Sequence, residues 1–468
     1  MDAATIRAWK PELEGFLQRF EDCFPRRDTR AHLNVYVGGQ FSDVQRKNVE
    51  AMALEQGVPV RTLQEFLSQH KWDEDRLRDR LQQIVRDEHA DDQAIGLIDE
   101  TSDAKKGDKT PGVQRQYLGC VGKQDNGIVT VHLGYAAGDF HCLLDGQLFL
   151  PESWSEDRDR CREAGIPDGV VYRPKTQIAL DMYDRARGNG VTFRWLTFDE
   201  WYGAKPSFLR ALDDRGQTFV GETHGGFVAW TEPPSVTRRG YRKGGRGRRR
   251  KTPRLRGNAP PAQCLEDLVR DKPVFTDQPW QPWRVKDGQK GPMVWEVRHA
   301  SIWIKGEGGL PIGPWHLIVC RNVLDPTEAK YFISNAAPQT PLETLLLVAF
   351  SRWRVERCFE DQKGEVGLDH YEGRRYIGLK RHLILSSVSY LFLSRVAQRL
   401  RGEKSGVDGP PGAHGGLCPG AVRVAGPLGR RRPAGTGRCQ DRLDAEKERP
   451  GSQEPLQSNT KKTSRARH

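Results

Sequence analysis

The first ninety residues carry apolar side chains at intervals close to 3.6 residues. The pattern runs through IRAWKPELEGFLQRF, DVQRKNVEAMALEQG, VRTLQEFLSQH and EDRLRDRLQQIVRDEH, and it predicts an α-helix in each. Gly57 separates two of these segments, so a helix, a turn and a second helix are expected there. Residues 1–90 are therefore predicted to form a helical N-terminal domain, either a DNA-reading module or an ordinary helical bundle.

From about residue 94 the apolar positions follow a different pattern. AIGLID, QRQYLGCVG and GIVTVHLGYAAG are strand-like runs, with the turn-like KQDNG between the last two. WSEDRDRCREAG and KTQIALDMYDRARGNG then predict helices, and VTFRWLTFDEWYG predicts a further strand. Strands followed by helices that alternate with strands indicate a mixed α/β layer.

Strand-like segments return at MVWEVRHASIWI, HLIVCRN and KYFISNA. TPLETLLLVAF and RWRVERCFEDQKGEVGLDH then predict one amphipathic helix, and RHLILSSVSYLFLSRVAQRLR predicts a final helix. Residues 403–468 show no period and are rich in Gly, Pro, Arg and Ala, whose codons are GC-rich. We expect a disordered extension read out of frame from about codons 402 to 406; a natural basic tail that binds DNA is the alternative.

The net charge of the chain indicates the kind of partner it binds. Lys and Arg number 74 against 62 Asp and Glu, which gives a formal charge of +12 and a pI near 9.3. An excess of this kind favours nucleic acid as partner, although a basic soluble enzyme is the alternative. Residues 231–262 concentrate Arg, Lys, Gly and Pro, and predict a disordered arm that neutralises DNA phosphates, with a soluble linker as the alternative. The residues expected to contact phosphates are Arg246, Arg248, Arg249, Arg250 and Lys251.

Cysteine usage and hydropathy indicate a cytoplasmic protein without a membrane partner. The nine cysteines show no CxxC pair and no zinc spacing, so they are expected to be reduced thiols. The N-terminus lacks the apolar core of a signal peptide. The longest apolar stretch, at 383–393, is too short and too polar to span a bilayer.

Two predicted strands end in an acid, Asp99 in GLIDET and Asp199 in LTFDEWYG. An Asp at the end of an apolar strand costs desolvation unless something binds it. Two such carboxylates brought together repel each other, and a hard cation such as Mg²⁺ relieves the repulsion. The choice of acids stays open because Glu100 and Glu200 follow directly, and because Asp commonly starts turns.

The helix expected after the last strand carries a third acid between two cations. At about 100° per residue, Glu356 lies about 40° and Lys363 about 20° round the helix from Arg352. One face can therefore hold a metal ligand, Glu356, and two phosphate-binding cations, Arg352 and Lys363. Ordinary i,i+4 pairing at a surface is the alternative, and Glu360 lies near the same face.

The segments GLIDETS, LTFDEWYG and FSRWRVERCFEDQKGEVGLDHYEGR resemble the DDE transposases of bacterial insertion sequences, in the branch with a Tyr-Arg-Glu-Lys signature. Arg352, Glu356 and Lys363 match the signature spacings; the Tyr position is Ala349, beside Phe350. The resemblance implies a ribonuclease H-like α/β fold over residues 91–402, a mixed sheet with flanking helices and a β-rich insertion at about 205–340. Asp99 would lie on its first strand, Asp199 on its fourth and Glu356 on its late helix.

The resemblance also implies the reaction. Asp99, Asp199 and Glu356 would hold two Mg²⁺ ions, for which Mn²⁺ can substitute, to cleave DNA at transposon ends and transfer the strands into target DNA. The implied partners are double-stranded DNA, as terminal inverted repeats and target, and a second copy in a homodimeric synaptic complex on the bacterial nucleoid. A metal-dependent nuclease without strand transfer and an inactive DNA-binding remnant of a transposase are the alternatives. A two-carboxylate glycosidase would need neither the Arg-Glu-Lys face nor the basic arm.

Overall fold

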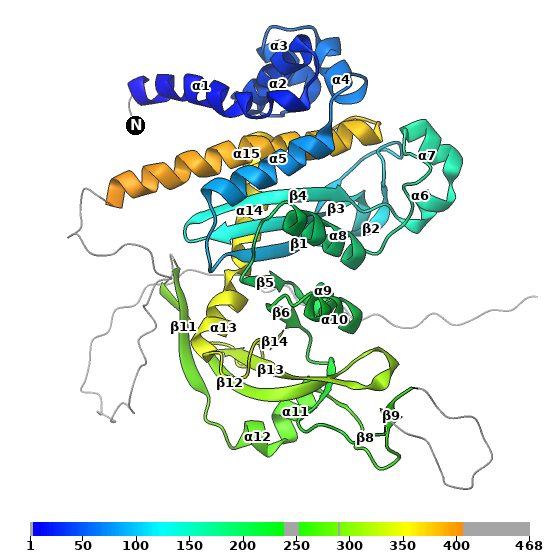
Figure 1. Cartoon of the computed structure of the whole chain (residues 1–468), viewed down its shortest axis with the longest axis vertical. Helices are drawn as coiled ribbons and strands as arrows, with labels where there is room; N and C mark the ends of the chain where they lie inside the picture. The colour runs from blue at the N-terminus through cyan, green and yellow to red at the C-terminus, as the bar shows by residue number, and fades with distance from the viewer. Residues whose placement is uncertain (1–2, 238–251, 289–290, 406–468) are drawn as a thin grey trace, which may run out of the picture. The chain divides into compact units, whose positions relative to one another are not determined.

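The computed structural model describes residues 3–237, 252–288 and 291–405 (Figure 1). The basic positions between 246 and 251 and the tail beyond 405 lie outside the described residues. Within the described part, no helix has the length and apolarity needed to cross a bilayer.

The N-terminal segments are helical, as the 3.6-residue period predicts. They are α1 (Ala3–Gln18), the 3-10 helix η1 (Glu21–Cys23), α2 (Arg27–Gln40), α3 (Val49–Glu55), α4 (Val60–Ser68) and α5 (Glu74–Glu88). Gly57 has a φ of 67° between α3 and α4, a left-handed conformation that glycine adopts without strain. The side chain of Asn48 caps α3 by accepting a hydrogen bond from the Ala51 amide at 2.9 Å. The predicted succession of helix, turn and second helix is therefore present, and its ability to bind DNA stays a prediction.

The centre of the fold is a mixed sheet with flanking helices. Its first strands are β1 (Ile95–Ala104), β2 (Gln114–Leu118), β3 (Lys123–Ala137), β4 (Phe140–Leu148), β5 (Trp195–Phe198) and β6 (Phe219–Thr223). The connecting helices are α6 (Glu152–Glu156), α7 (Arg158–Ala164), α8 (Lys175–Gly188), α9 (Glu200–Gly203) and α10 (Pro206–Asp214). Antiparallel β4, β3 and β1 are followed across the sheet by β5 and β6, which both run parallel to β1. This arrangement confirms the predicted mixed α/β fold.

The sheet continues beyond β6 into a β-rich region. Its elements are β7 (Val228–Trp230), β8 (Val236–Thr237), β9 (Arg254–Leu255), β10 (Gln263–Cys264), α11 (Leu265–Asp271), α12 (Pro273–Thr276), β11 (Gln281–Gly288), β12 (Gly291–Lys305), η2 (Glu307–Gly309), β13 (Pro311–Asn322) and β14 (Ala329–Ser334). β14 pairs with β6, and β13, β12, β7 and β10 follow in that order. Figure 1 shows β14, β13 and β12 side by side. β8 pairs with β9, so the two ends of the basic segment are joined by a short ribbon. The interval 205–340 therefore holds α10 and β6 as well as the inserted strands.

The last helices are α13 (Leu342–Ala349), η3 (Phe350–Arg352), α14 (Trp353–Val366) and α15 (Tyr376–Ser405). The single helix expected across 340–370 is wrong, because a 3-10 turn at η3 interrupts it and α14 ends at Val366. Phe350 lies in that turn and packs against Trp295 and Phe332, at ring-centroid distances of 5.8 and 5.5 Å. The ring of Phe350 is thus part of the apolar contact with the inserted strands. α14 continues along β1, β3 and β4.

Two local predictions also need correction. KQDNG is not a turn: β3 starts at Lys123, and the chain reverses just before it, at Gly122 with a φ of 66°. β1 does not end at Asp99 but continues to Ala104, because its second half pairs with β3. Only the pairing of β1 with β5 stops before Asp99.

Candidate active site

Three acidic residues follow matching positions on three adjacent parallel strands. Ile98 of β1 pairs with Phe198 of β5, and Phe198 pairs with Gly221 of β6. The next residues on the three strands are Asp99, Asp199 and Glu222. Since carboxyl ends of parallel strands meet at one edge of a sheet, the register places the three acids in a row.

The carboxylate of Asp99 lies in the most enclosed part of this row. Asp99 is 7% exposed, and its Oδ1 accepts a hydrogen bond from the Glu100 amide at 2.7 Å. Burial raises the pKa of Asp99 to about 7; the Arg352 guanidinium opposes this rise, and Asp199 adds to it. Burial also raises the pKa of Asp199, whose Oδ1 accepts a hydrogen bond from the Tyr202 amide at the start of α9. Both carboxyl groups thus lack sufficient positive charge around them.

Arg352 is the cation that lies among these acids. Its Nη1 is 2.9 Å from Asp99 Oδ2, and its Nη2 is 2.7 Å from Glu356 Oε1. The structure therefore brings Asp99, Arg352 and Glu356 into contact, and Asp199 is the neighbour of Asp99 in the row. Glu356 stands at the rim, with its side chain 57% exposed.

Lys363 of α14 contacts a different part of β1 from Arg352. Its Nζ donates a hydrogen bond to the backbone carbonyl of Ser102 at 3.2 Å, three residues beyond Asp99. Helical periodicity predicts Lys363 on the same face as Arg352, and both side chains do contact β1. Because Lys363 is eleven residues further along the helix, it contacts a different part of the strand.

Sequence reasoning missed Glu222, which contributes to the row from the end of β6. Its side chain is 14% exposed and its Oε1 lies 2.6 Å from Lys330 Nζ. The segment FVGET repeats the pattern of GLIDET, an apolar strand followed by an acid, and this signal could have found it.

A lysine and an exposed indole border the acids on the other side. Lys175 Nζ lies 2.7 Å from Glu100 Oε2 and 5.1 Å from the ring centroid of Trp201. Lys205 Nζ is 5.2 Å from the same ring, and Trp201 is 41% exposed two residues after Asp199. Ammonium groups over an accessible indole form a surface suited to polyanions with aromatic bases.

The oxygen atoms of Asp99, Asp199 and Glu356 are chemically suitable ligands for a hard divalent cation. Among the described residues, no three Asp, Glu, His or Cys side chains are arranged to hold a metal ion together. Instead, the guanidinium of Arg352 is the cation that contacts both Asp99 and Glu356. Ionised carboxylate oxygens are the ligands that Mg²⁺ prefers, and a bound cation would favour the ionised form of Asp99 and Asp199, so the residue types present suit such an ion.

The raised pKa of Asp99 predicts a pH-dependent loss of stability in metal-free protein. The pKa of Asp99 is near 3.8 in the unfolded chain and about 7 in the folded protein. Between these two pH values the folded protein binds a proton that the unfolded chain does not. The free energy of unfolding therefore falls as pH rises through this window. Asp99→Asn removes the titration. We expect the free energy of unfolding of the variant, relative to the natural chain, to increase from pH 5 to pH 8. Urea unfolding in EDTA measures it, and a pH-independent difference would contradict the assignment.

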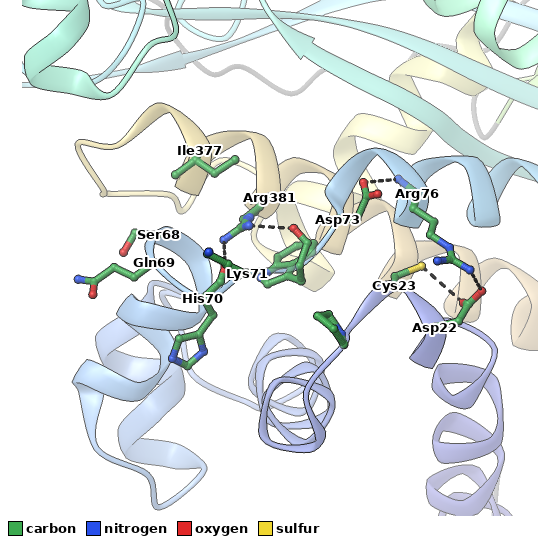
Figure 2. Close-up of a pocket in the computed structure, with 12 residues that line it drawn as sticks. Asp22, Cys23, Ser68, Gln69, His70, Lys71, Asp73, Arg76, Ile377 and Arg381 are labelled. Carbon is green, nitrogen blue, oxygen red and sulfur yellow. Dashed lines mark hydrogen bonds and ion pairs between the residues drawn. The ribbon is translucent and has the colours of Figure 1, made fainter.

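A cavity of about 540 Å³ lies apart from this row, among the N-terminal helices and α15 (Figure 2). Its lining mixes both signs of charge, with Asp22 paired to Arg76 at 2.6 Å. Arg381 lines it too, and donates hydrogen bonds to the backbone carbonyls of His70 and Trp72. Arg76 and Arg381 are thus paired within the protein, and none of Asp99, Asp199 and Glu222 lines the cavity.

A ribonuclease H-like order of strands, with acids at the ends of its parallel strands and a third acid on a covering helix, defines a class of enzymes that act on polynucleotides. The family model described as DDE superfamily endonuclease matches residues 19–292, more than half of the chain. This chain therefore belongs to the DDE superfamily of endonucleases. The match includes Asp99 and Asp199 and ends before Glu356.

One curated relative is the probable transposase for insertion sequence element IS701 of Microchaete diplosiphon. It is 30% identical to this chain over 213 residues, which are 44% of this chain and 52% of the relative. The chain thus spans about half the length of the curated relative that it matches. Together with the family model, this similarity supports the predicted resemblance to the DDE transposases of insertion sequences.

Proposed function

We propose that this chain is the transposase of an insertion sequence, which cleaves double-stranded DNA at the ends of the element and joins the freed strands to target DNA. The observation that carries the proposal is the placement of Asp99 and Asp199 directly after the parallel pairing of β1 with β5, with Arg352 in contact with both Asp99 and Glu356. The family assignment and the similarity to a probable IS701 transposase support it.

Asp99, Asp199 and Glu356 would hold two Mg²⁺ ions, or Mn²⁺ in their place. When bound, such ions supply an activated water or 3′-hydroxyl and neutralise charge on the leaving oxygen. The chain's own contribution is position and charge. Asp99 is held by β1 and Asp199 by its position between β5 and α9, and Arg352 would meet phosphate oxygens once its carboxylate partners bind ions. Lys175 and Lys205, beside Trp201, would guide the DNA strand toward the acids.

The test mixes the protein with labelled duplexes that carry the inverted repeats flanking the gene, and with a circular plasmid as target. Each of the two ends of the element is supplied as such a duplex. With Mg²⁺ we expect nicking at the ends and a joined product in the plasmid; without divalent ions we expect neither. Cleavage without joining would identify a nuclease instead. Binding without metal-stimulated cleavage would identify an inactive remnant.

The basic segment predicts a separate, sequence-independent contribution to DNA binding. Deleting residues 238–256, which include Arg246, Arg248, Arg249, Arg250 and Lys251, should weaken binding about equally for all sequences. The slope of log affinity against log salt should fall by about 0.9 for each lost phosphate contact. Fluorescence anisotropy between 50 and 200 mM salt measures this slope.

A scrambled segment of the same composition is the matched control. Because phosphate contacts carry little sequence information, it should bind like the natural chain. An unchanged slope after the deletion would show that the segment does not contact DNA.

A further inference from the structure

A line of ion pairs connects the inserted strands with the acids of the active site. Lys330 of β14 lies 2.6 Å from Oε1 of Glu222, and the other oxygen of Glu222 lies 3.9 Å from Nε of Arg352. The two terminal nitrogens of Arg352 contact Asp99 and Glu356. One guanidinium therefore faces three carboxylates from three different elements.

The carboxylates of Asp99 and Glu356 cannot both remain paired with Arg352 and coordinate a divalent ion through the same oxygens. Asp99 and Glu356 are the proposed ligands, so an entering ion competes with the guanidinium for their oxygens. The side chain of Arg352 is only 22% exposed. A charge so enclosed is costly when it loses its counter-charge.

Glu222 is placed to supply that counter-charge. It belongs to a central strand, its side chain is 14% exposed, and Lys330 fixes one of its oxygens. Its free oxygen already faces Nε, the guanidinium nitrogen not used by Asp99 or Glu356. Arg352 can thus shift toward Glu222 by a small side-chain movement without becoming an unpaired buried charge.

We propose that Glu222 is a positioning residue, which holds Arg352 as divalent ions enter at Asp99, Asp199 and Glu356 and thereby sets the affinity for those ions. The inference rests on the proposed function. It assigns to the inserted strands, through Lys330, a part in preparing the active site for metal.

The test is Mn²⁺ binding to the intact protein without DNA, measured by calorimetry. Glu222→Gln keeps the shape and removes the charge, so Arg352 should stay on Asp99 and Glu356. The dissociation constant for Mn²⁺ should rise about tenfold, within the range of coupling between contacting residues. In an Arg352→Gln background the same substitution should raise it about twofold or less, because only the direct charge effect is left.

Glu296→Gln is the matched control. Glu296 lies on β12 and pairs with Arg321 at 2.7 Å in the same sheet, and the structure places neither residue against Arg352. This variant should bind Mn²⁺ like the natural chain. Lys330→Gln is the second variant: it keeps the charge of Glu222 but releases its position, so a smaller loss of affinity is expected. It provides the test if Glu222→Gln does not fold.

An equal loss of Mn²⁺ affinity in both Arg352 backgrounds would overturn the inference, since it would show a direct charge effect alone. No loss in either Glu222→Gln or Lys330→Gln would also overturn it. Asp99→Asn separates this failure from failure of the proposed function. If Asp99→Asn abolishes Mn²⁺ binding while the Glu222 variant binds normally, only the role of Glu222 is rejected. If Asp99→Asn binds Mn²⁺ normally, the metal site itself is rejected as well.

Discussion

Asp99→Asn, Asp199→Asn and Glu356→Gln are each expected to abolish DNA cleavage while leaving DNA binding intact. Each substitution removes one charged oxygen ligand with little change of shape. Loss of a single preorganised hydrogen-bond donor costs about a hundredfold to a thousandfold in rate. A lost metal ligand should cost at least about a thousandfold, because both the position of the ion and its charge are affected.

Nicking of the element's ends with Mg²⁺ measures the first effect, and a mobility shift in EDTA measures binding. Glu360→Gln is the matched control, one helical turn beyond Glu356. The side chain of Glu360 is 72% exposed and pairs with Arg357 at 3.0 Å, so its substitution should leave cleavage unchanged. Full cleavage by one of the three acid variants would remove that residue from the site. Glu100 or Glu200 would then be tested in place of an aspartate, and a loss of cleavage in Glu360→Gln would assign Glu360 in place of Glu356.

Arg381→Leu is expected to destabilise the protein more than the loss of any exposed ion pair. Arg381 is 5% exposed and its guanidinium lies 4.3 Å from the ring centroid of Trp72. It donates hydrogen bonds to four backbone carbonyls at 2.9 to 3.4 Å, two in the last part of α4 (Phe66 and Leu67) and two between α4 and α5 (His70 and Trp72), and lies 3.4 Å from Glu74. Figure 2 shows Arg381 beside His70. Leu removes these donors, so the carbonyls of Leu67, His70 and Trp72 lose a partner, whereas Glu74 keeps its ion pair with Lys380. A buried acceptor left without its donor costs about 1 to 3 kcal/mol, so we expect a total loss of at least about 3 kcal/mol.

Urea unfolding followed by circular dichroism measures this loss. Arg61→Leu is the matched control in the N-terminal helices. Arg61 makes an i,i+4 pair with Glu65 at 2.6 Å, and its side chain is 84% exposed, so the unfolding midpoint should hardly change. Equal stability of the Arg381 variant and the natural chain would show that α15 does not hold the turn between α4 and α5.

The sequence by itself determined the helical N-terminal segments, the mixed α/β class and two strand-end acids. These features depend on local periodicity and on residues adjacent in the chain, such as Gly57 between two helices. Arg352 and Glu356 were also within reach of the sequence, because a separation of four residues on one helix fixes their mutual position. The motif around them then indicated the family.

The contacts between these elements were decided only by the tertiary structure. The extension of β1 beyond Asp99 depends on pairing with β3, and the 3-10 turn before Arg352 occurs where Phe350 packs against the distant Trp295 and Phe332. The place of Glu222 beside Asp199 depends on the register of β5 with β6. Such contacts join residues far apart in the chain, and hydrophobic periodicity carries no information about which distant partners will pair. The sequence could therefore name three of the acids, whereas the sheet decided that a fourth, held by Lys330, faces the same arginine.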